Sequence, residues 1–256
     1  MAGTAVIVGA AVASETFFTT DVYLAFLVAF LVCGAGNVIN DYFDFEIDGI
    51  NNPSRPLPSG KISLGAAHLY ALGVFAVGVL VSIFINRAAL LIAAFNSVLL
   101  YAYAWRIKKS GGISKNFTVS YLAASPFLFG GVVVGNALVT LLLALLAGLA
   151  NTGREIIKDI EDLEGDRKVI KTLPVEIGIE KSATLASTFI LAAVIISPLP
   201  YILGILSINY LAAVALADAI FVYAALKLRS KRARETQKLV KLGMLFGLVA
   251  FLAGGL

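Results

Sequence analysis

The chain has very few of the residues that build sites in soluble proteins. It contains one cysteine, Cys33, and one histidine, His68, among 256 residues. A single cysteine excludes an intramolecular disulfide framework, and a single histidine cannot form a histidine-based metal site. Charged residues make up only 14% of the chain, whereas a soluble domain carries about 25%. The net charge is only +4, so nucleic acid is not an expected partner.

Hydrophobic residues are present in excess. They make up 59% of the chain, and the mean hydropathy is +0.92. A helix needs about 20 apolar residues to cross the hydrocarbon core of a bilayer, so the uncharged runs predict an all-α membrane protein with nine transmembrane helices. These runs are 1–14, 22–40, 62–86, 88–105, 116–153, 182–217, 219–226 and 242–256. The run 116–153 holds two spans that turn near Gly135-Asn136. The run 182–217 holds one span and begins another, with a break around 197–200, and this second span continues through Asp218 to about residue 226.

Basic residues divide the predicted loops into two groups. The loops at 40–61, 106–115, 151–181 and 227–241 contain 19 of the 20 Lys and Arg residues, and Arg87 alone lies on the other side. Cytoplasmic loops of membrane proteins are enriched in Lys and Arg. We therefore expect a multi-pass protein of the cytoplasmic membrane. Because 13 of the 16 acidic residues share the basic side, we expect the active-site mouth to face the cytoplasm.

Acidic residues recur with the same spacing after the second and the sixth predicted spans. The first set is Asp41, Asp44 and Asp48, and the second set, 118 positions later, is Asp159, Asp162 and Asp166. Steps of three and four residues place three carboxylates on one face of a helix. The recurrence predicts a single domain over residues 1–256 that is built from two four-helix repeats plus one helix. The approximate repeat halves are 1–115 and 116–235, and the last helix is 238–256.

Three carboxylates on one face repel one another and require a positive charge nearby. An all-oxygen set of Asp and Asn side chains suits Mg²⁺, which commonly bridges protein carboxylates and substrate phosphates. The two acidic sets therefore predict a magnesium-dependent diphosphate site. The alternative is that both sets are merely solvated helix ends.

Basic residues near the acidic sets suit an anionic leaving group. Arg55 lies in a loop with three prolines, and Arg154 and Lys158 lie within helical reach of the second set. Arg can bind a diphosphate with two hydrogen bonds, whereas Lys acts as a point charge. For Lys109, Lys115 and the basic cluster at 227–241, we expect a role in topology or in binding anionic lipid.

These residues match a known family. The string from Asn40 to Asp48, followed by residues 52–60, resembles the first signature of the UbiA-type intramembrane prenyltransferases. The string from Lys158 to Asp166, followed by 172–174, is similar to their second signature. The segment 103–108 looks like the Tyr/Lys element of the family, and Asn116 matches a frequent asparagine. The resemblance extends from about residue 34 to residue 178.

The resemblance implies a bundle of nine helices around a central, lipid-facing cavity, with Mg²⁺ as the cofactor. Within the family, the amino-acid sequences of both signature segments most resemble those of one group of members. These members use geranylgeranyl diphosphate as donor and geranylgeranylglyceryl phosphate as acceptor in archaeal ether-lipid synthesis. Membrane lipids are expected as further partners, and no obligatory protein partner is evident.

The resemblance also implies roles for individual residues. The metal ligands are expected to be Asn37, Asn40, Asp41, Asp44, Asp48, Asp159, Asp162 and Asp166, and the catalytic residues among them are expected to be Asp44, Asp48, Asp162 and Asp166. The residues expected to bind the diphosphate or substrate are Arg55, Lys61, Tyr103, Lys108, Asn116, Arg154 and Lys158.

Two alternative functions remain open at this point. A family member with an aromatic or chlorin acceptor, as in quinone or chlorophyll synthesis, would have the same donor site. An ion-coupled transporter would place its acidic residues near the bilayer midplane, and only Asp218 is predicted to lie there. We expect Asp218 to make a polar contact between helices. The Arg-Pro pair that the family usually has near the start of the first helix is absent, which favours a trimmed N-terminus.

Overall fold

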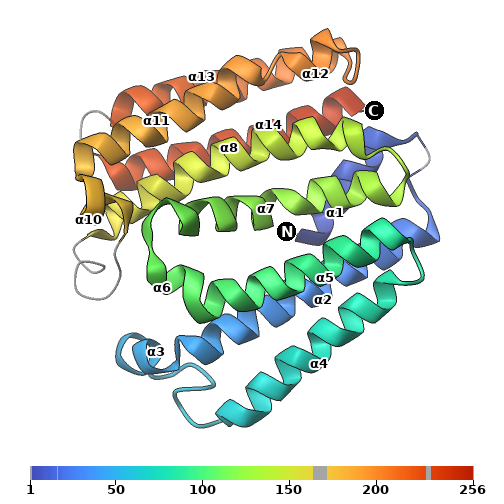
Figure 1. Ribbon diagram of the computed structural model, residues 1–256. Coiled ribbons are helices and arrows are strands. Elements are labelled where there is room, and N and C mark those ends of the chain that lie inside the picture. Colours follow the sequence, from blue (N-terminus) through green and yellow to red (C-terminus); the bar gives the residue numbers. More distant parts are fainter. Residues whose placement is uncertain (1, 16, 164–171, 229–231, 256) are drawn as a thin grey trace.

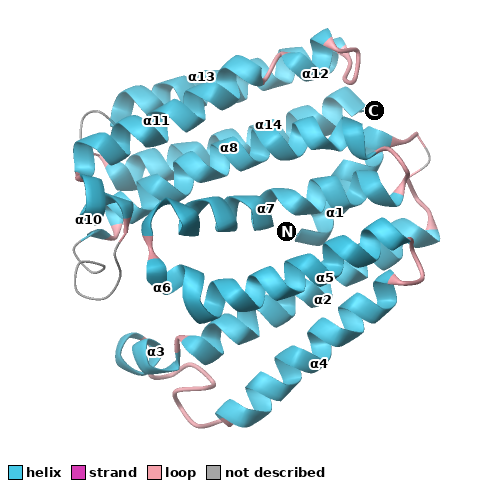
Figure 2. Cartoon of the chain, viewed as in Figure 1, coloured by secondary structure: helices cyan, strands magenta, loops and turns pink. Residues whose placement is uncertain are grey.

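The computed structural model consists of helices and connecting loops over the residues it describes, which are 2–15, 17–163, 172–228 and 232–255 (Figure 2). In these ranges eight helical segments are long and apolar enough to cross a membrane. They are α2 (Thr20–Phe43), α4 (Leu64–Ser82), α5 (Arg87–Ala102) with its extension η1 (Tyr103–Ile107) and α6 (Lys108–Ser110), α7 (Gly112–Val133), α8 (Ala137–Glu161), α11 (Ile179–Ile196) with α12 (Leu199–Ile202), α13 (Ile208–Leu228) and α14 (Ala233–Gly255). The chain is a multi-pass membrane protein.

The predicted first span is shorter than the others. Helix α1 (Ala2–Ala13) has 12 residues, which at 1.5 Å per residue gives a length of about 18 Å. It packs against α7, α2 and α14. The described ranges therefore contain eight helices of spanning length and one short apolar helix, where the sequence predicts nine spans.

The long helices lie side by side, with α4 at one edge of the bundle and α11 and α13 at the opposite edge (Figure 1). The breaks between helices follow local chemistry. Gly135 has a φ of +78° between α7 and α8, which confirms the predicted turn, since a glycine adopts this conformation at little cost. Pro198 separates α11 from α12, as predicted. The side chains of Thr19, Ser63 and Asn86 cap the starts of α2, α4 and α5 by accepting backbone N–H bonds.

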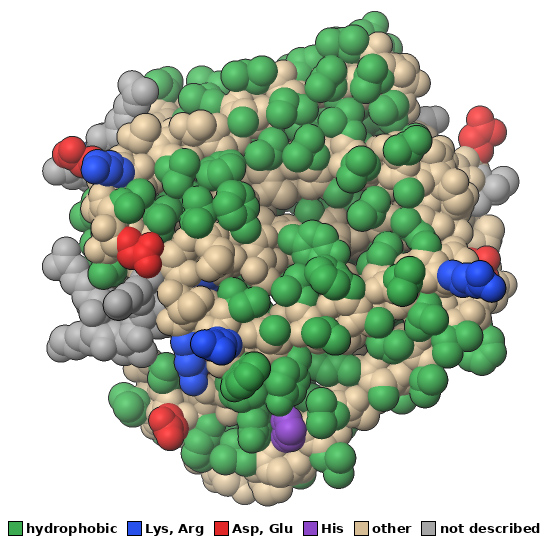
Figure 3. All heavy atoms as spheres, viewed as in Figure 1, with side chains coloured by type: hydrophobic (Ala, Val, Ile, Leu, Met, Phe, Trp, Pro, Cys, Tyr) green, Lys and Arg blue, Asp and Glu red, His purple; other side chains and the backbone are tan. Residues whose placement is uncertain are grey.

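The outer surface of the bundle is hydrophobic over most of its length. Large apolar side chains such as Leu69, Leu91 and Ile195 are exposed. On the face drawn in Figure 3, the middle of the helices is largely apolar and the charged side chains lie toward the two ends. This distribution suits a surface that contacts lipid chains in the middle and water at both ends.

The interior has two apolar clusters that meet at α1 and α7. One cluster includes Val28 and Ile39 of α2, and the other includes Ile156 of α8 and Tyr210 of α13. Both contain residues of α1 and α7, so these two helices join the two parts of the bundle. Their backbones approach closely, since a Cβ atom built on Gly130 would lie 2.2 Å from the carbonyl oxygen of Val6.

We predict that Gly130→Ala destabilises the protein, because the added methyl group would push α1 away from α7. Overpacking typically costs about 1–3 kcal/mol. The matched control is Gly34→Ala on α2, where nothing lies within 4 Å of the added atom and where alanine favours the helix by up to about 1 kcal/mol. Thermal unfolding in detergent measures both variants. Equal melting temperatures for Gly130→Ala and the wild type would contradict the close packing of α1 on α7.

Candidate functional site

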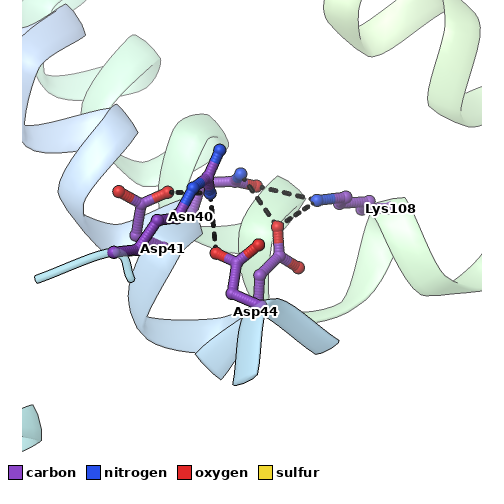
Figure 4. Close-up of polar contacts among 6 residues, drawn as sticks. Asn40, Asp41, Asp44 and Lys108 are labelled. Carbon is purple, nitrogen blue, oxygen red and sulfur yellow. Dashed lines mark hydrogen bonds and ion pairs between the residues drawn. The ribbon is translucent and has the colours of Figure 1, made fainter. Parts of the chain in front are cut away.

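The first acidic segment lies where α2 ends and the short helix α3 (Phe45–Asn51) begins. Asp44 occupies the junction, with φ −90° and ψ 3°. The side-chain amide of Asn40 donates a hydrogen bond to Oδ2 of Asp44 at 3.0 Å. The ammonium group of Lys108 forms an ion pair with Asp44 and donates to Oδ1 of Asn40 at 3.3 Å (Figure 4). An amide and a cation from separate helices thus hold one carboxylate.

Arg55 links the other two carboxylates of this segment. Its Nη1 atom lies 2.7 Å from Oδ2 of Asp48 and 3.4 Å from Oδ1 of Asp41. The hydrogen bond and the charge of Asp48 raise the pKa of the Arg55 guanidinium above its ordinary value, so Arg55 stays charged. The Asp48 side chain is buried, whereas Asp41 is about half exposed. All three residues line a pocket of about 500 Å³ beside the proline-rich loop.

A π-helical turn positions Lys108 for this contact. In η1 the backbone N–H of Lys108 donates to the carbonyl oxygen of Tyr103, five residues earlier. Such turns insert one extra residue into a helix and occur frequently at functional sites. Tyr103 lines the main cavity while Lys108 contacts Asp44. One short segment with a π-turn therefore supplies a side chain to the cavity wall and another to the first acidic segment.

The second acidic segment lies near the end of α8. Asp159 is only 3% exposed, and its Oδ1 atom lies 2.5 Å from Nζ of Lys115, which is also buried, on α7. Among the described residues, Oδ2 of Asp159 is buried and has no hydrogen-bond partner. The predicted binding of Lys115 to anionic lipid is wrong, because Lys115 is buried and neutralises a buried carboxylate. Its predicted role in topology stays a prediction. The one sequence signal was its position directly before Asn116, at the start of an apolar run.

Polar side chains continue along the contact between α7 and α8. Nδ2 of Asn151 lies 3.4 Å from Oγ of Ser120. Asn116 lies one turn before Ser120 on α7, and Glu155 lies one turn after Asn151 on α8. Asn116 is fully buried, and neither polar atom of its side chain has a hydrogen-bond partner within the described ranges. Glu155 is paired with Arg154 at 2.5 Å. Buried polar groups normally have partners, so the Asn116 amide keeps unused donors and an unused acceptor at this contact.

The two acidic segments come together at Tyr103. The phenol of Tyr103 interacts electrostatically with Asp44 of the first segment and with Glu155 and Asp159 of the second. Carboxylates that lie more than 100 positions apart in the sequence are therefore near enough to act on one side chain. This convergence is the central feature of the site.

A large cavity extends from this point into the bundle. Its volume is about 770 Å³, and residues of α1, α2, α5, α7, α8, α11, α13 and α14 line it. Most of the lining side chains are apolar, and Tyr103, Asn151, Arg154 and Glu155 lie at its acidic end. The cavity can hold a long apolar chain whose polar head lies among the carboxylates.

The other predicted site residues lie at the surface. Asn37, Lys61, Lys158 and Asp162 are exposed. Asp162 ends α8 with φ −85° and ψ 1°, which are nearly the angles of Asp44 at the end of α2. Asp166 lies outside the described residues.

Asp218 makes a contact between helices, as predicted. Its Oδ2 atom accepts a hydrogen bond from the hydroxyl of Ser197 at 2.6 Å. Tyr210 donates to the carbonyl oxygen of the same serine at 2.6 Å. These bonds join α13 to the end of α11.

The donor chemistry fits a hard divalent cation. The side chains of both segments offer only carboxylate and amide oxygens, which Mg²⁺ prefers, and Oδ2 of Asp159 is a buried acceptor without a partner among the described residues. No group of three or more acidic, histidine or cysteine side chains in the described ranges is close enough to hold a metal ion as they stand. Three of the carboxylates, Asp48, Asp44 and Asp159, instead pair with Arg55, Lys108 and Lys115.

Comparison with known sequences gives a consistent result. The UbiA prenyltransferase family matches residues 2–251. A protein of Methanopyrus kandleri named digeranylgeranylglyceryl phosphate synthase is 46% identical over 99% of this chain and 94% of its own length. A protein of Methanosarcina mazei with the same name is 45% identical over 94% of this chain and 84% of its own length.

Solved structures have the same fold. A structure described as that of digeranylgeranylglyceryl phosphate synthase has a TM-score of 0.90 and 44% identity, over 99% of this chain and 92% of that chain. A UbiA homologue from Archaeoglobus fulgidus bound to GPP and Mg²⁺ has a TM-score of 0.74 at 17% identity, over 98% of this chain and 95% of that chain. By sequence match over nearly its whole length, this chain belongs to the UbiA prenyltransferase family.

Proposed function

We propose that this chain transfers a geranylgeranyl group from geranylgeranyl diphosphate to the free hydroxyl of geranylgeranylglyceryl phosphate, the reaction of a digeranylgeranylglyceryl phosphate synthase. The observation that carries this proposal is an apolar cavity of about 770 Å³ with Tyr103, Arg154 and Glu155 in its wall, in a bundle where both acidic segments hold ion pairs with lysines. Relatives named for this activity, 42–46% identical over most of the chain, support the choice of acceptor.

The proposed cofactor is Mg²⁺, bound through oxygen atoms of both acidic segments. We assign its ligands to Asn37, Asn40, Asp41, Asp44, Asp48, Asp159, Asp162 and Asp166, with Asp44, Asp48, Asp162 and Asp166 as the catalytic residues. When bound, Mg²⁺ would supply positive charge to the oxygens of the departing diphosphate. The UbiA homologue that contains GPP and Mg²⁺ supports this choice of cation.

The basic and polar side chains of the site have a complementary role. Arg55 and Lys108 already contact the first segment, and their donors suit the diphosphate head of the donor lipid. We expect the hydroxyl of Tyr103, which lines the cavity, and the unpartnered amide of Asn116 to donate hydrogen bonds to the same head. Lys61, Arg154 and Lys158 complete the proposed substrate-binding set.

The proposed reaction needs charge stabilisation and exclusion of water. The allylic C–O bond breaks, and both bonding electrons leave with the diphosphate. The acceptor oxygen then forms the new C–O bond to the same carbon and loses its proton to an oxygen at the polar mouth. Apolar side chains line the cavity beyond the mouth, so water has little access to the cationic carbon.

The proposed topology places the site on the cytoplasmic side of a single domain of nine spans, with α1 as the short first span. Two repeats of four helices, residues 1–115 and 116–235, precede a last helix at 238–256. A shift of 118 positions relates Asp44 to Asp162, and α2 and α8 end directly before these residues with nearly equal backbone angles. This correspondence supports the repeat.

The experiment that tests the proposed function measures diphosphate release by the purified protein with geranylgeranyl diphosphate and Mg²⁺. We expect release with geranylgeranylglyceryl phosphate and none with 4-hydroxybenzoate. Release with the aromatic acid alone would instead indicate a family member that uses an aromatic acceptor, as in quinone synthesis. No release with either acceptor would refute the proposed prenyl transfer.

We predict that Asp44→Asn and Asp162→Asn each lower kcat at least about 100-fold, because each removes a charge that the reaction requires. The control is Asp21→Asn, which lies in the first turn of α2 at the opposite end of that helix. Steady-state kinetics with all three variants provides the measurement. Retention of wild-type kcat by either site variant would refute its catalytic assignment.

Removal of divalent cations should stop turnover. We expect EDTA to abolish diphosphate release and added Mg²⁺ to restore it, because the carboxylates alone would repel the diphosphate. A parallel sample with EDTA and excess Mg²⁺ controls for damage by the chelator. Turnover that survives rigorous chelation would exclude the proposed metal dependence.

A further inference from the structure

A second cation, besides Arg154, contributes to the wall of the large cavity. Lys241 of α14 lines the cavity together with Met244, Leu245 and Leu248. These residues are spaced by three and four positions, so they share one face of the helix. Lys241 is the member nearest to the start of α14, which lies on the same side of the bundle as the end of α8. The sequence predicts a role in topology or lipid binding for this lysine, whereas the structure assigns it to the cavity wall.

The packing of α14 against α8 places Lys241 and Arg154 at the same level. The two helices pack together, and Nε of Arg234 lies 3.9 Å from Oε1 of Glu161 near the ends that they share. The two helices run in opposite directions. Arg154 lies seven residues before Glu161 on α8, and Lys241 lies seven residues after Arg234 on α14, so both steps lead the same way along the bundle. Seven residues are two helical turns, or about 10 Å. Both basic residues line the cavity.

The two basic residues differ in their partners. Arg154 is paired with Glu155 at 2.5 Å. No ion pair involves Lys241 within the described ranges, and Asp218, the other acidic residue of the cavity wall, accepts a hydrogen bond from Ser197. Lys241 is exposed rather than buried, so its ammonium group can pair with an anion that enters the cavity.

We propose that Lys241 and Arg154 bind the phosphate group of the acceptor lipid, an inference that rests on the proposed function. The anion must have a long apolar tail, because the face of α14 beyond Lys241 and the face of α8 beyond Arg154 are apolar cavity wall. The donor diphosphate has cations of its own in Arg55 and Lys108, which contact the first acidic segment. Lys241 thus provides a second anion site for a phosphate on the same glyceryl unit as the reacting hydroxyl.

The phosphate that Lys241 binds has two other conceivable sources, the donor diphosphate and the head group of an ordinary anionic phospholipid. The test therefore measures three quantities for each variant in detergent. They are KM for geranylgeranylglyceryl phosphate, KM for geranylgeranyl diphosphate, and the response of turnover to added phosphatidylglycerol. The variants are Lys241→Met, Lys241→Gln and Lys241→Arg, and the matched control is Lys238→Met, an exposed residue of the same helix that is outside the cavity wall.

We expect Lys241→Met and Lys241→Gln to raise KM for the acceptor about tenfold or more, since a hydrogen bond to a charged group is lost. KM for the donor should change less than twofold, Lys241→Arg should retain most of the acceptor affinity, and Lys238→Met should behave like the wild type. The neutral variants should also lose the preference of the wild type for the phosphorylated acceptor over its dephosphorylated analogue, geranylgeranylglycerol, in competition experiments.

Three results would overturn the proposal. An unchanged KM for the acceptor would exclude contact with its phosphate, and an equal rise in both KM values would assign Lys241 to the donor. Loss of only the response to phosphatidylglycerol would assign it to bilayer lipid. A wild-type protein without turnover on geranylgeranylglyceryl phosphate would instead refute the proposed function, so the two failures are distinguishable. The neutral glutamine variant covers the case in which the methionine variant does not fold.

Discussion

Repulsion among carboxylates at the ends of α2 and α8 is the constraint on which the rest of the site depends. In a helical bundle surrounded by lipid, unpaired charges at close range are far more costly than in water. The protein meets this cost with a separate cation for each part of the site: Arg55 for Asp48, Lys108 for Asp44 and Lys115 for Asp159. Arg55 and Lys108 are also suited to the oxygens of a diphosphate, and we propose that they bind the substrate as well.

Several otherwise unrelated features of the fold serve this arrangement. The π-turn in η1 brings Lys108 to Asp44 while Tyr103 stays at the cavity. The proline-rich loop carries Arg55 back over the start of α3, where it reaches Asp48. The contact of α7 with α8 buries the pair of Lys115 and Asp159 and leaves the Asn116 amide without a partner among the described residues. Beyond these polar groups the bundle encloses an apolar cavity, as expected for a prenyl chain with a charged head.

The sequence predicts the helical segments well because their signals are local. Long uncharged runs, the turn at Gly135 and the break at Pro198 depend only on neighbouring residues. The spacing of the acidic residues likewise indicates where the site lies. The pairing of Lys115 with Asp159 could not be predicted, because it depends on the register of two helices 44 positions apart in the sequence. The placement of Lys241 in the cavity depends in the same way on how α14 packs against α8. Three carboxylates on one continuous helix were expected at the first segment, whereas the structure ends α2 at Asp44.

The most direct test of a shared site is the binding of Mn²⁺, followed by electron paramagnetic resonance, in the presence of a thio analogue of geranylgeranyl diphosphate that ionises slowly. Wild-type protein, Asp44→Asn and Asp159→Asn would be compared with and without the analogue. If both acidic segments hold one cation-dependent diphosphate site, the analogue should promote Mn²⁺ binding by the wild type, and each single variant should lower the affinity about tenfold or more. Wild-type affinity for Mn²⁺ in either variant would contradict a site shared by the two segments.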